Sequence, residues 1–453
     1  AGAALVVGER PVPADFPGDR AYAQVENARR ELGMLASAFL GHPSRRMEVI
    51  GITGTDGKTT TTYLVDWLLT HAGLSVGRTT TVDYRFPGEE PVANNSRFTT
   101  LEAPEVQRTL AEMAAHGAQI AIVETTSSGL ALHRVHGIAY DIAVFTNLTS
   151  EHLEVHGTWE SYRRAKAMLF EAVDPAAPPK PVKVAARRLC VLNADDPSCA
   201  YMRGFARVDV LTYGVTVPAD VSAGAVTLRE DGSAYTVRFP DGVSVRIESP
   251  LVGDYNVANC LAALSVGYAH GIEPDVMAQA MATFPGVPGR MERIVAGQPF
   301  TVVVDYAHTA ESLGKILRVL RPITTGRLIV VFGSAGDRDA TKRAPMGAVA
   351  AREADFGIIT DEDPRTEDAM DILRQIATGM EAAGAHEGER YRCIVGRRLG
   401  IEAAMRMARP GDTVLLAGKG HEQSIEIGRV KTPWDDRRVA REVLAELGLS
   451  VEV

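Results

Sequence analysis

The chain has 453 residues, of which 45% are hydrophobic and 23% charged, and these proportions exclude a disordered or fibrous protein. Its 57 acidic and 48 basic residues leave a net charge of −9, which argues against nucleic acid or an anionic membrane as a partner. The apolar runs fall far short of the roughly 20 residues of a membrane span, and four cysteines without CxxC spacing indicate free thiols in a reducing, cytoplasmic compartment.

Strand-like and helix-like segments alternate along most of the chain, which predicts an α/β fold with parallel sheets. The first clear unit is an apolar strand at residues 48–53, followed by a glycine-rich turn and a helix over 58–71. A second helix is predicted over 101–116, where Thr99 and Glu102 have the spacing of a capping box. These elements begin a central α/β domain.

Further along, buried strands are predicted at 119–123 and 142–145. Residues 225–249 then break the alternation, because two Asp-Gly pairs separate three runs of alternating polarity. Asp-Gly between alternating runs is a strong signal for antiparallel hairpins. We therefore expect a small antiparallel meander attached to the central domain.

A cluster of proline and glycine at residues 284–290 predicts a domain boundary. At about 100–200 residues per domain, the chain should hold two to four domains, and residues 1–47 are too few for an independent α/β domain. We expect a short N-terminal segment (1–47), a central domain (48–288) and a Rossmann-like C-terminal domain (289–453). Strands of the last domain are predicted at 301–304, 327–332, 356–360, 391–395 and 413–416.

The most informative segment is the glycine-rich loop GITGTDGKT at residues 51–59. Backbone N–H groups of such a loop, together with the helix N-terminus, form a cradle for phosphate. Lys58 can reach the terminal phosphates of ATP, and the hydroxyl of Thr59 can bind Mg²⁺. An ordinary glycine turn is the alternative, but the flanking strand and helix favour a short P-loop. The ATP-binding residues expected here are Gly54, Thr55, Asp56, Gly57, Lys58, Thr59 and Thr60.

A phosphate loop requires an acidic metal partner. Glu124 ends a predicted strand, so its carboxylate would emerge at the C-terminal edge of a parallel sheet; a solvated glutamate is the alternative. His152 and His156 are four residues apart, but the intervening Glu154 does not make an HExxH motif, so zinc is not expected. A role near a Mg²⁺–phosphate site is more plausible for one of these histidines. Lys166, taken alone, reads as an exposed helix lysine.

Taken together, these motifs resemble those of the Mur ligases, the ATP-dependent amide-forming enzymes of peptidoglycan precursor synthesis. The GTNGKT loop of that family matches residues 54–59, with Asp56 in place of asparagine, and its FTNL–DHLD–HGT stretch matches residues 145–158. The resemblance extends from residue 41 to residue 436. It implies that residues 1–47 are the remnant of a UDP-binding domain, that the central domain binds ATP and that the C-terminal domain binds the incoming amino acid.

The resemblance also implies roles for individual residues. Two Mg²⁺ ions would be held by Thr59, Glu124, His152 and Lys166, the last as a CO₂-derived carbamate, and Lys58, Lys166 and His152 would be catalytic. Asn256, Arg290, Asp305 and His308 would contact ATP, and Lys342 and Arg343 would lie on the phosphate side. The substrate-binding residues would be Thr99, Thr100, Thr126, Arg134, Asp363, Arg365, Gly418 and Glu422.

The implied reaction begins when the D-glutamate γ-carboxylate of UDP-N-acetylmuramoyl-L-alanyl-D-glutamate attacks the γ-phosphate of ATP. The resulting acyl phosphate is then attacked by the amine of a diamino acid, and phosphate leaves. Arg365 favours meso-diaminopimelate, because a guanidinium suits its distal carboxylate. Asp363 keeps L-lysine and L-ornithine open, because it replaces the asparagine of the DNPR motif of the family. Arg365 could also simply pair with Asp363 or Glu362.

Three other functions remain open. A folylpolyglutamate-synthetase-like ligase is disfavoured by the HGT and GKGHE elements. A P-loop kinase or mechanical ATPase would not explain Lys166. An inactive binding homologue is suggested by the substitutions at Asp56, Ser128 and Ala335. The expected partners are small molecules only, and the resemblance implies a monomer.

Overall fold

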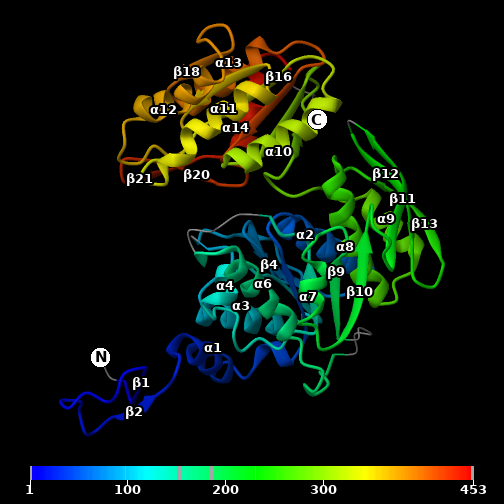
Figure 1. Cartoon of the computed structure of the whole chain (residues 1–453), viewed down its shortest axis with the longest axis vertical. Coiled ribbons are helices and arrows are strands. Elements are labelled where there is room, and N and C mark those ends of the chain that lie inside the picture. The colour runs from blue at the N-terminus through cyan, green and yellow to red at the C-terminus, as the bar shows by residue number, and fades with distance from the viewer. Residues whose placement is uncertain (1–2, 97, 150–155, 183–187, 230, 450–453) are drawn as a thin grey trace. The chain divides into compact units, whose positions relative to one another are not determined.

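The computed structural model describes the chain except for residues 1–2, 97, 150–155, 183–187, 230 and 450–453 (Figure 1). It contains two compact units, residues 1–228 with 232–284, and residues 285–453. The three-domain division expected from the sequence stays a prediction. The N-terminal segment holds a parallel strand pair, β1 (Leu5–Gly8) and β2 (Ala21–Gln24), then helix α1 (Ala28–Phe39) and a 3₁₀ turn, η1 (Pro43–Arg45).

The first unit is built on a large sheet in the strand order β13-β12-β11-β10-β9-β8-β3-β7-β4-β5-β6. Its centre is parallel, from β4 through β7, β3, β8 and β9 to β10. The strands are β3 (Glu48–Thr53), β4 (Val76–Thr79), β5 (Asp83–Arg85), β6 (Val92–Ala93), β7 (Ile120–Glu124), β8 (Ile142–Phe145), β9 (Leu189–Asn193), β10 (Asp209–Gly214), β11 (Val221–Arg229), β12 (Gly232–Arg238) and β13 (Ser244–Ser249).

The predicted meander corresponds to β11, β12 and β13, and the β12–β13 pair is antiparallel as expected. It is not a separate sheet, because β11 pairs with β10 and so continues the central sheet. The helices of this unit are α2 (Lys58–His71), α3 (Ala103–Ala115), α4 (Ser127–Ala131), α6 (Trp159–Glu171), α7 (Cys199–Arg203), α8 (Asp254–Ala269) and α9 (Pro274–Ala282).

The capping box predicted for the second helix is shifted. Glu102, not Thr99, is the N-cap of α3, and the side chain of Glu105 accepts from the backbone N–H of Glu102 at 3.3 Å. Thr99 instead contacts Thr81. The helix therefore begins two residues later than the apolar pattern predicted.

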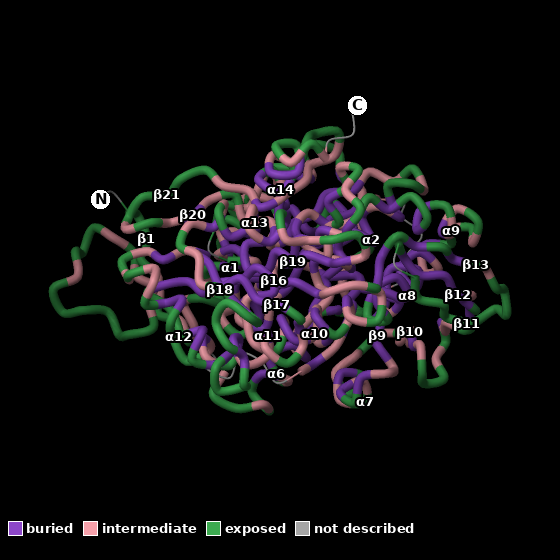
Figure 2. The backbone as a smooth tube through the Cα atoms, turned by 90° about the horizontal axis from the view of Figure 1, so that it is seen from above, coloured by how far each residue is buried: buried purple, intermediate pink, exposed green. Residues whose placement is uncertain are grey.

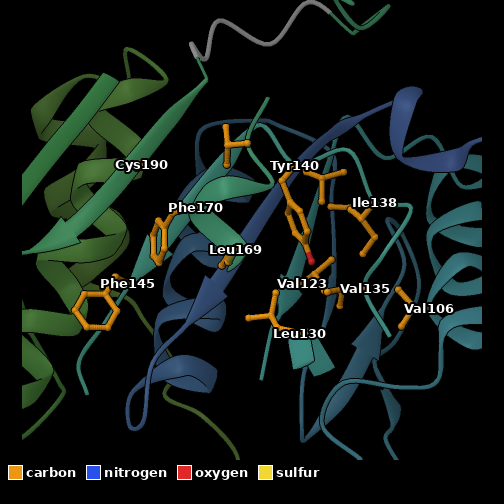
Figure 3. Packing of buried hydrophobic residues seen from close by; sticks show 14 of the residues in the cluster. Val106, Val123, Leu130, Val135, Ile138, Tyr140, Phe145, Leu169, Phe170 and Cys190 are labelled. Carbon is orange, nitrogen blue, oxygen red and sulfur yellow. The ribbon is translucent and has the colours of Figure 1, made fainter. Parts of the chain in front are cut away.

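Helices cover both faces of the parallel strands, which explains why these strands read as continuous apolar runs. On one face, alternate residues of β3, β7, β8 and β9 pack against α3 and α6. Figure 3 shows the edge-to-face contact there between the rings of Phe145 on β8 and Phe170 on α6, whose centroids are 6.3 Å apart. The absence of a side chain at Gly51 permits this close packing, since a Cβ there would lie 2.7 Å from both Leu169 and Tyr140.

The second unit has a six-stranded sheet in the order β14-β15-β19-β16-β17-β18. All neighbours are parallel except β14 and β15. Figure 2 shows that β16, β17 and β19 are buried. The strands are β14 (Glu292–Ile294), β15 (Thr301–Asp305), β16 (Leu328–Phe332), β17 (Phe356–Thr360), β18 (Tyr391–Ile394) and β19 (Thr413–Ala417), and a separate hairpin consists of β20 (Ser424–Ile427) and β21 (Val430–Pro433).

Helices again lie on both sides of this sheet. One apolar core joins it to α10 (Ala310–Leu320), α11 (Arg343–Glu353) and α12 (Ala369–Ala382). The other joins it to α13 (Arg397–Met407) and α14 (Asp436–Glu446). Short 3₁₀ turns, η2 (Arg321–Ile323) and η3 (Ala340–Lys342), complete the unit. This three-layer arrangement confirms the predicted α/β fold class. Among the described helices, none has the length and apolar character needed to cross a membrane.

Candidate active site

The predicted phosphate loop joins β3 to α2. Gly57 is the N-cap of α2 and has a left-handed backbone (φ 79°), where a Cβ would lie 2.3 Å from the Asn259 side chain. Lys58 opens the helix, and its Nζ donates to the carbonyl oxygens of Gly54 at 3.1 Å and Thr55 at 2.7 Å. The loop therefore lies at a helix N-terminus with a lysine folded over it, as phosphate binding requires.

The segment after β8 holds this loop in place. The side chain of Asn147 accepts from the N–H of Asp56 at 2.9 Å, and its carbonyl accepts from the N–H of Thr55 at 2.8 Å. The hydroxyl of Thr146 donates to the carbonyl of Asp56 at 2.6 Å. Because β3 and β8 are neighbours, their carboxyl ends lie side by side. The sequence motif FTN marked this segment, but no role for Thr146 or Asn147 was predicted.

Glu124 ends β7 and is only 2% exposed, so the alternative of a solvated glutamate is wrong. The hydroxyl of Thr59 lies 3.0 Å from each carboxylate oxygen of Glu124 and donates to them. Both residues offer hard oxygen atoms, which Mg²⁺ prefers, and nucleotide phosphates and water usually complete its coordination. This donor pair therefore fits the metal that the resemblance implies.

Lys166 lies on α6 and is 2% exposed, so it is not the surface lysine that its sequence suggested in isolation. Its Nζ donates to the carbonyl of Gly54 at 2.6 Å and lies 4.6 Å from the ring centre of Tyr162. The structure thus brings Lys58 and Lys166 to the same loop carbonyl. His152, the remaining predicted metal ligand, lies outside the described residues. The described parts of the chain contain no cluster of three or more His, Cys, Asp or Glu that could hold a metal.

The predicted substrate threonines gather beside Glu124. The hydroxyl of Thr100 donates to the Glu124 carbonyl at 3.1 Å and accepts from the N–H of Thr126 at 3.0 Å. Arg134 donates to the Thr100 carbonyl at 3.3 Å and pairs with Glu102 at 2.8 Å. These side chains form one connected group next to the phosphate loop.

Asn256 lies near the start of α8, where its side chain donates to the carbonyl of Val252 at 2.8 Å and accepts from Asn259 at 3.0 Å. Asn259 in turn accepts from the hydroxyl of Thr61 on α2 at 3.3 Å. The predicted Asn256 is thus linked to the phosphate loop through Asn259, which the sequence reasoning did not assign.

In the second unit, predicted nucleotide residues gather where β15 ends. Asp305 accepts from the N–H groups of Met291 and Ala307, each at 2.8 Å, and the guanidinium of Arg290 lies 4.6 Å from the ring centre of Tyr306. Burial lowers the pKa of His308 below the ordinary histidine value. Nδ1 of the same ring donates to the carbonyl oxygen of Tyr306 at 2.8 Å.

The other two basic candidates of this unit have structural partners. Lys342 donates to the carbonyl of His308 at 3.0 Å. Arg343 is buried and forms a bidentate ion pair with Glu367. The placement of Arg343 on the phosphate side stays a prediction, and in this structure its guanidinium is held by Glu367.

The GKGHE motif at residues 418–422 contains a fully buried lysine, Lys419. No role for this lysine was predicted from the sequence. Its ammonium lies 2.8 Å from Asp363 and 2.6 Å from Glu422. Burial alone would lower the pKa of Lys419, but the two carboxylates hold it above the ordinary lysine value. Burial also raises the pKa of Glu422. At Gly418, a Cβ would come within 3.3 Å of the buried Glu362 carboxylate.

Arg365 does not pair with Asp363 or Glu362, contrary to the structural alternative considered for it. Its Nε lies 3.4 Å from a carboxylate oxygen of Glu426 on β20, and its N–H donates to the Glu426 carbonyl at 3.0 Å. Its backbone is left-handed, with φ 52°. Asp363 accepts from the N–H of Glu426 at 3.0 Å. The hairpin of β20 and β21 therefore holds both residues of the predicted specificity motif.

Comparisons with known proteins agree with this geometry. The Mur ligase middle-domain family matches residues 52–267, and the Mur ligase glutamate ligase domain matches residues 289–420. A UDP-N-acetylmuramyl-tripeptide synthetase of Roseiflexus sp. is 49% identical over 99% of this chain and 88% of that protein. A UDP-N-acetylmuramoyl-L-alanyl-D-glutamate–2,6-diaminopimelate ligase of Streptomyces coelicolor is 44% identical over 93% of this chain and 80% of the relative. A solved structure of a ligase with that same name is 30% identical, with a TM-score of 0.67 over 98% of this chain and 87% of that one.

A P-loop beside a buried carboxylate and a buried lysine, on a parallel sheet, defines an ATP-using α/β enzyme. The chain belongs to the Mur ligase family. It is accordingly an ATP-dependent ligase that forms an amide bond in peptidoglycan precursor synthesis, and enzymes of this family use Mg²⁺. This assignment separates it from the P-loop kinases and mechanical ATPases considered above.

Proposed function

We propose that the protein adds meso-diaminopimelate to UDP-N-acetylmuramoyl-L-alanyl-D-glutamate, with conversion of ATP to ADP and phosphate. The observation that carries the proposal is the convergence of Lys58, Lys166, Thr59 and Glu124 around one phosphate loop. The names of the Streptomyces relative and of the solved structure point to the same substrates. Arg365 supports diaminopimelate as the added amino acid, since a guanidinium can pair with its distal carboxylate.

Side chains of this protein would account for most of the first step, in which the γ-phosphate of ATP is transferred to the D-glutamate carboxylate. Lys58 lies where a terminal phosphate enters the cradle, so in place of its contacts to loop carbonyls it would neutralise charge on the transferred group. Thr99, Thr100, Thr126 and Arg134 would orient the nucleotide sugar so that its D-glutamate carboxylate faces the γ-phosphate. Thr59 and Glu124, with His152, would hold Mg²⁺, which supplies charge neutralisation during phosphoryl transfer.

We propose that Lys166 functions as a carbamate. Its ammonium would first lose one proton, and the neutral amine would then form a C–N bond to CO₂ and lose a second proton. These two steps would convert a buried cation into an anion suited to a metal. The support is its burial against the phosphate loop, since an unmodified ammonium there would oppose Mg²⁺ binding. A second cation could then be held beside the one at Thr59 and Glu124.

Residues of the second unit would present ATP and the amino acid. In the first unit, Asn256 would contact a nucleotide held by the phosphate loop. In the second unit, Arg290, Asp305 and His308 are the residues proposed for nucleotide contact. Asp363, Arg365, Gly418 and Glu422 would surround the diamino acid, with the Arg365 guanidinium facing its distal carboxylate. We further propose that the enzyme works as a cytoplasmic monomer on small molecules, as the resemblance implies.

The test is a ligation assay with the purified chain, ATP, Mg²⁺ and the nucleotide dipeptide, in which diaminopimelate, L-lysine and L-ornithine are supplied in turn. We expect ADP release to require both the nucleotide and an amino acid, and the product mass to show diaminopimelate. ADP release without the nucleotide would contradict the proposal, and so would glutamate addition to a folate in its place. No turnover with any of the three amino acids would identify an inactive homologue.

A further inference from the structure

The carboxylate of Glu124 has a second partner besides the phosphate loop. Thr81, in the turn between β4 and β5, donates its backbone N–H to one oxygen at 2.9 Å and its hydroxyl to the other at 3.1 Å. One residue therefore holds both oxygens of the carboxylate. Two directional bonds to opposite oxygens fix the plane of the group, which one bond cannot do.

The Thr81 hydroxyl also lies 2.9 Å from the hydroxyl of Thr99. A threonine hydroxyl carries one proton, and a carboxylate can only accept. The single proton of the Thr81 hydroxyl therefore faces two acceptors, the Glu124 carboxylate and the hydroxyl oxygen of Thr99, which compete for it. Thr100, the next residue, donates to the backbone carbonyl of Glu124. Two adjacent threonines of the proposed nucleotide-sugar site thus reach the same glutamate by different routes.

A buried charge network prevents the turn that carries Thr81 from shifting. The neighbouring Thr80 accepts from the N–H of Asp83 at 3.0 Å. Asp83 accepts from Arg78 at 2.8 Å and from the hydroxyl of Tyr63 at 2.6 Å, and Arg78 also pairs with Asp66. All five of these residues are buried.

Tyr63 and Asp66 lie on α2, the helix that the phosphate loop opens. Thr59 on that helix and Thr81 on the turn are consequently fixed relative to each other. Both donate to the same carboxylate. The position of Glu124 is therefore fixed by Thr59 on the helix of the phosphate loop and by Thr81 next to the proposed nucleotide-sugar site.

We propose that Thr81 is a positioning residue that orients Glu124 for Mg²⁺ and couples the metal site to the nucleotide-sugar site through Thr99. This inference rests on the proposed function, in which Glu124 is a metal ligand. Thr59 would hold the cation through its hydroxyl oxygen, and its O–H would then no longer point at Glu124. Thr81 then remains to hold the carboxylate, so metal affinity depends on its hydroxyl.

The experiment measures Mn²⁺ binding by electron paramagnetic resonance to the full chain saturated with a non-hydrolysable ATP analogue. Thr81→Val keeps the shape but removes the hydroxyl, and it should weaken Mn²⁺ binding about tenfold, as is typical when a bond to a metal ligand is removed. Thr81→Ser restores the hydroxyl and should bind as the wild type does. The matched control is Thr212→Val, which removes a hydroxyl that donates to Asp220 at 2.6 Å away from the site.

A double-mutant cycle tests the coupling. Thr99→Val removes the acceptor that competes with Glu124 for the Thr81 proton, so it should tighten Mn²⁺ binding when residue 81 is threonine and have no effect when residue 81 is valine. Equal Mn²⁺ affinity in Thr81→Val and the wild type would overturn the proposal, as would a loss that Thr81→Ser shares or additive effects in the cycle. Glu124→Gln separates this from the proposed function: if it binds Mn²⁺ normally, Glu124 is not a ligand and the metal site proposed above is itself wrong.

Discussion

Asp363 and Lys419 form an ion pair inside the second unit, with a carboxylate oxygen of Asp363 2.8 Å from the lysine Nζ. The same oxygen accepts the backbone N–H of Glu426 at 3.0 Å. Asp363 is therefore occupied by protein donors. A carboxylate held by these donors should attract the distal ammonium of lysine or ornithine only weakly. We therefore expect Arg365, rather than Asp363, to contact the distal end of the amino acid.

Removal of Lys419 should destabilise the second unit. Lys419→Met leaves Asp363 and Glu422 without their buried cation, and breaking a buried pair typically costs about 3–5 kcal/mol. We expect a clear fall in the urea midpoint of unfolding of the second unit. Asp363→Asn should cost much less, because an amide oxygen can still accept from Lys419 and from the hairpin. Equal losses in the two variants would contradict this account.

The preference for an amino acid should follow Arg365 and its partner Glu426. Arg365→Ala should reduce kcat/KM for diaminopimelate by at least about tenfold, because a charge pair worth about 2–5 kcal/mol is lost, and leave L-lysine nearly unchanged. Glu426→Gln removes the carboxylate that competes for the guanidinium, so it should lower the KM for diaminopimelate. Kinetics with both amino acids provide the check, and an unchanged ranking in Arg365→Ala would rule out this role.

Lys166 should be indispensable for ligation. Lys166→Ala should lower turnover by at least about 100-fold, the scale typical of losing one charge-stabilising group, and short carboxylates should restore part of it by entering the space left by the side chain. Wild-type turnover should also fall when CO₂ and bicarbonate are removed from the buffer. Lys166→Arg is the matched control, since it keeps a cation that cannot form the carbamate; if it retains full activity, the carbamate is not required.

Lys58 should be needed for ATP turnover but not for folding. It is partly exposed and bonded only to loop carbonyls among the contacts described for it. Lys58→Ala should therefore abolish measurable ADP release while the thermal midpoint stays within a few degrees. Lys315→Ala, on the α10 surface, serves as a control for the loss of one lysine charge. Wild-type ADP release in Lys58→Ala would show that ATP binds elsewhere.

The buried ring of His421 should make stability depend on pH. Burial, with help from Arg290 and other nearby cations, lowers the pKa of His421 to about 3. In the unfolded chain it would titrate near 6.5, so between pH 6.5 and pH 3 the unfolded state binds the extra proton. The free energy of unfolding is therefore unaffected by His421 above pH 6.5. Below pH 6.5 it falls with the pH, by up to about 1.4 kcal/mol per pH unit.

The measurement for this prediction is the urea midpoint between pH 7.5 and pH 5. The wild type should lose stability across this range, and His421→Asn should flatten the profile. His386→Asn, at a surface loop, is the control. A profile for His421→Asn that is parallel to that of the wild type would show that other groups cause the pH dependence.

The sequence was sufficient for much of the fold. The strand β8 and the helix α2 begin and end where the apolar pattern placed them, because runs such as IAVF are buried on both faces and bounded by polar turns. The capping box predicted for Thr99 and Glu102 was wrong, because Glu102 and Glu105 form it instead. Local spacing alone cannot decide which of two such pairs caps the helix.

The candidate site was predictable where chemistry is carried by contiguous residues, as in the phosphate loop. It was not predictable where partners are distant along the chain. Thr81, Asn147 and Asn259 meet the loop or its glutamate only because neighbouring strands and helices end at one edge of the sheet. The burial of Lys419 likewise depends on two carboxylates, one of them 56 residues away.

Gly51 has a consequence that reaches beyond packing. It lies in the middle of β3, three residues before the carbonyl that Lys166 contacts, and the space left by its missing side chain is taken up by Leu169 of the same helix. Gly51→Ala would have to push α6 outward, and the lysine amine would be carried away from the loop with it. Gly51, which has no side chain, thus determines how closely the amine of Lys166 approaches the phosphate loop. Any attempt to transplant this loop into another scaffold would have to copy the bare backbone beneath it as well as the residues that touch ATP.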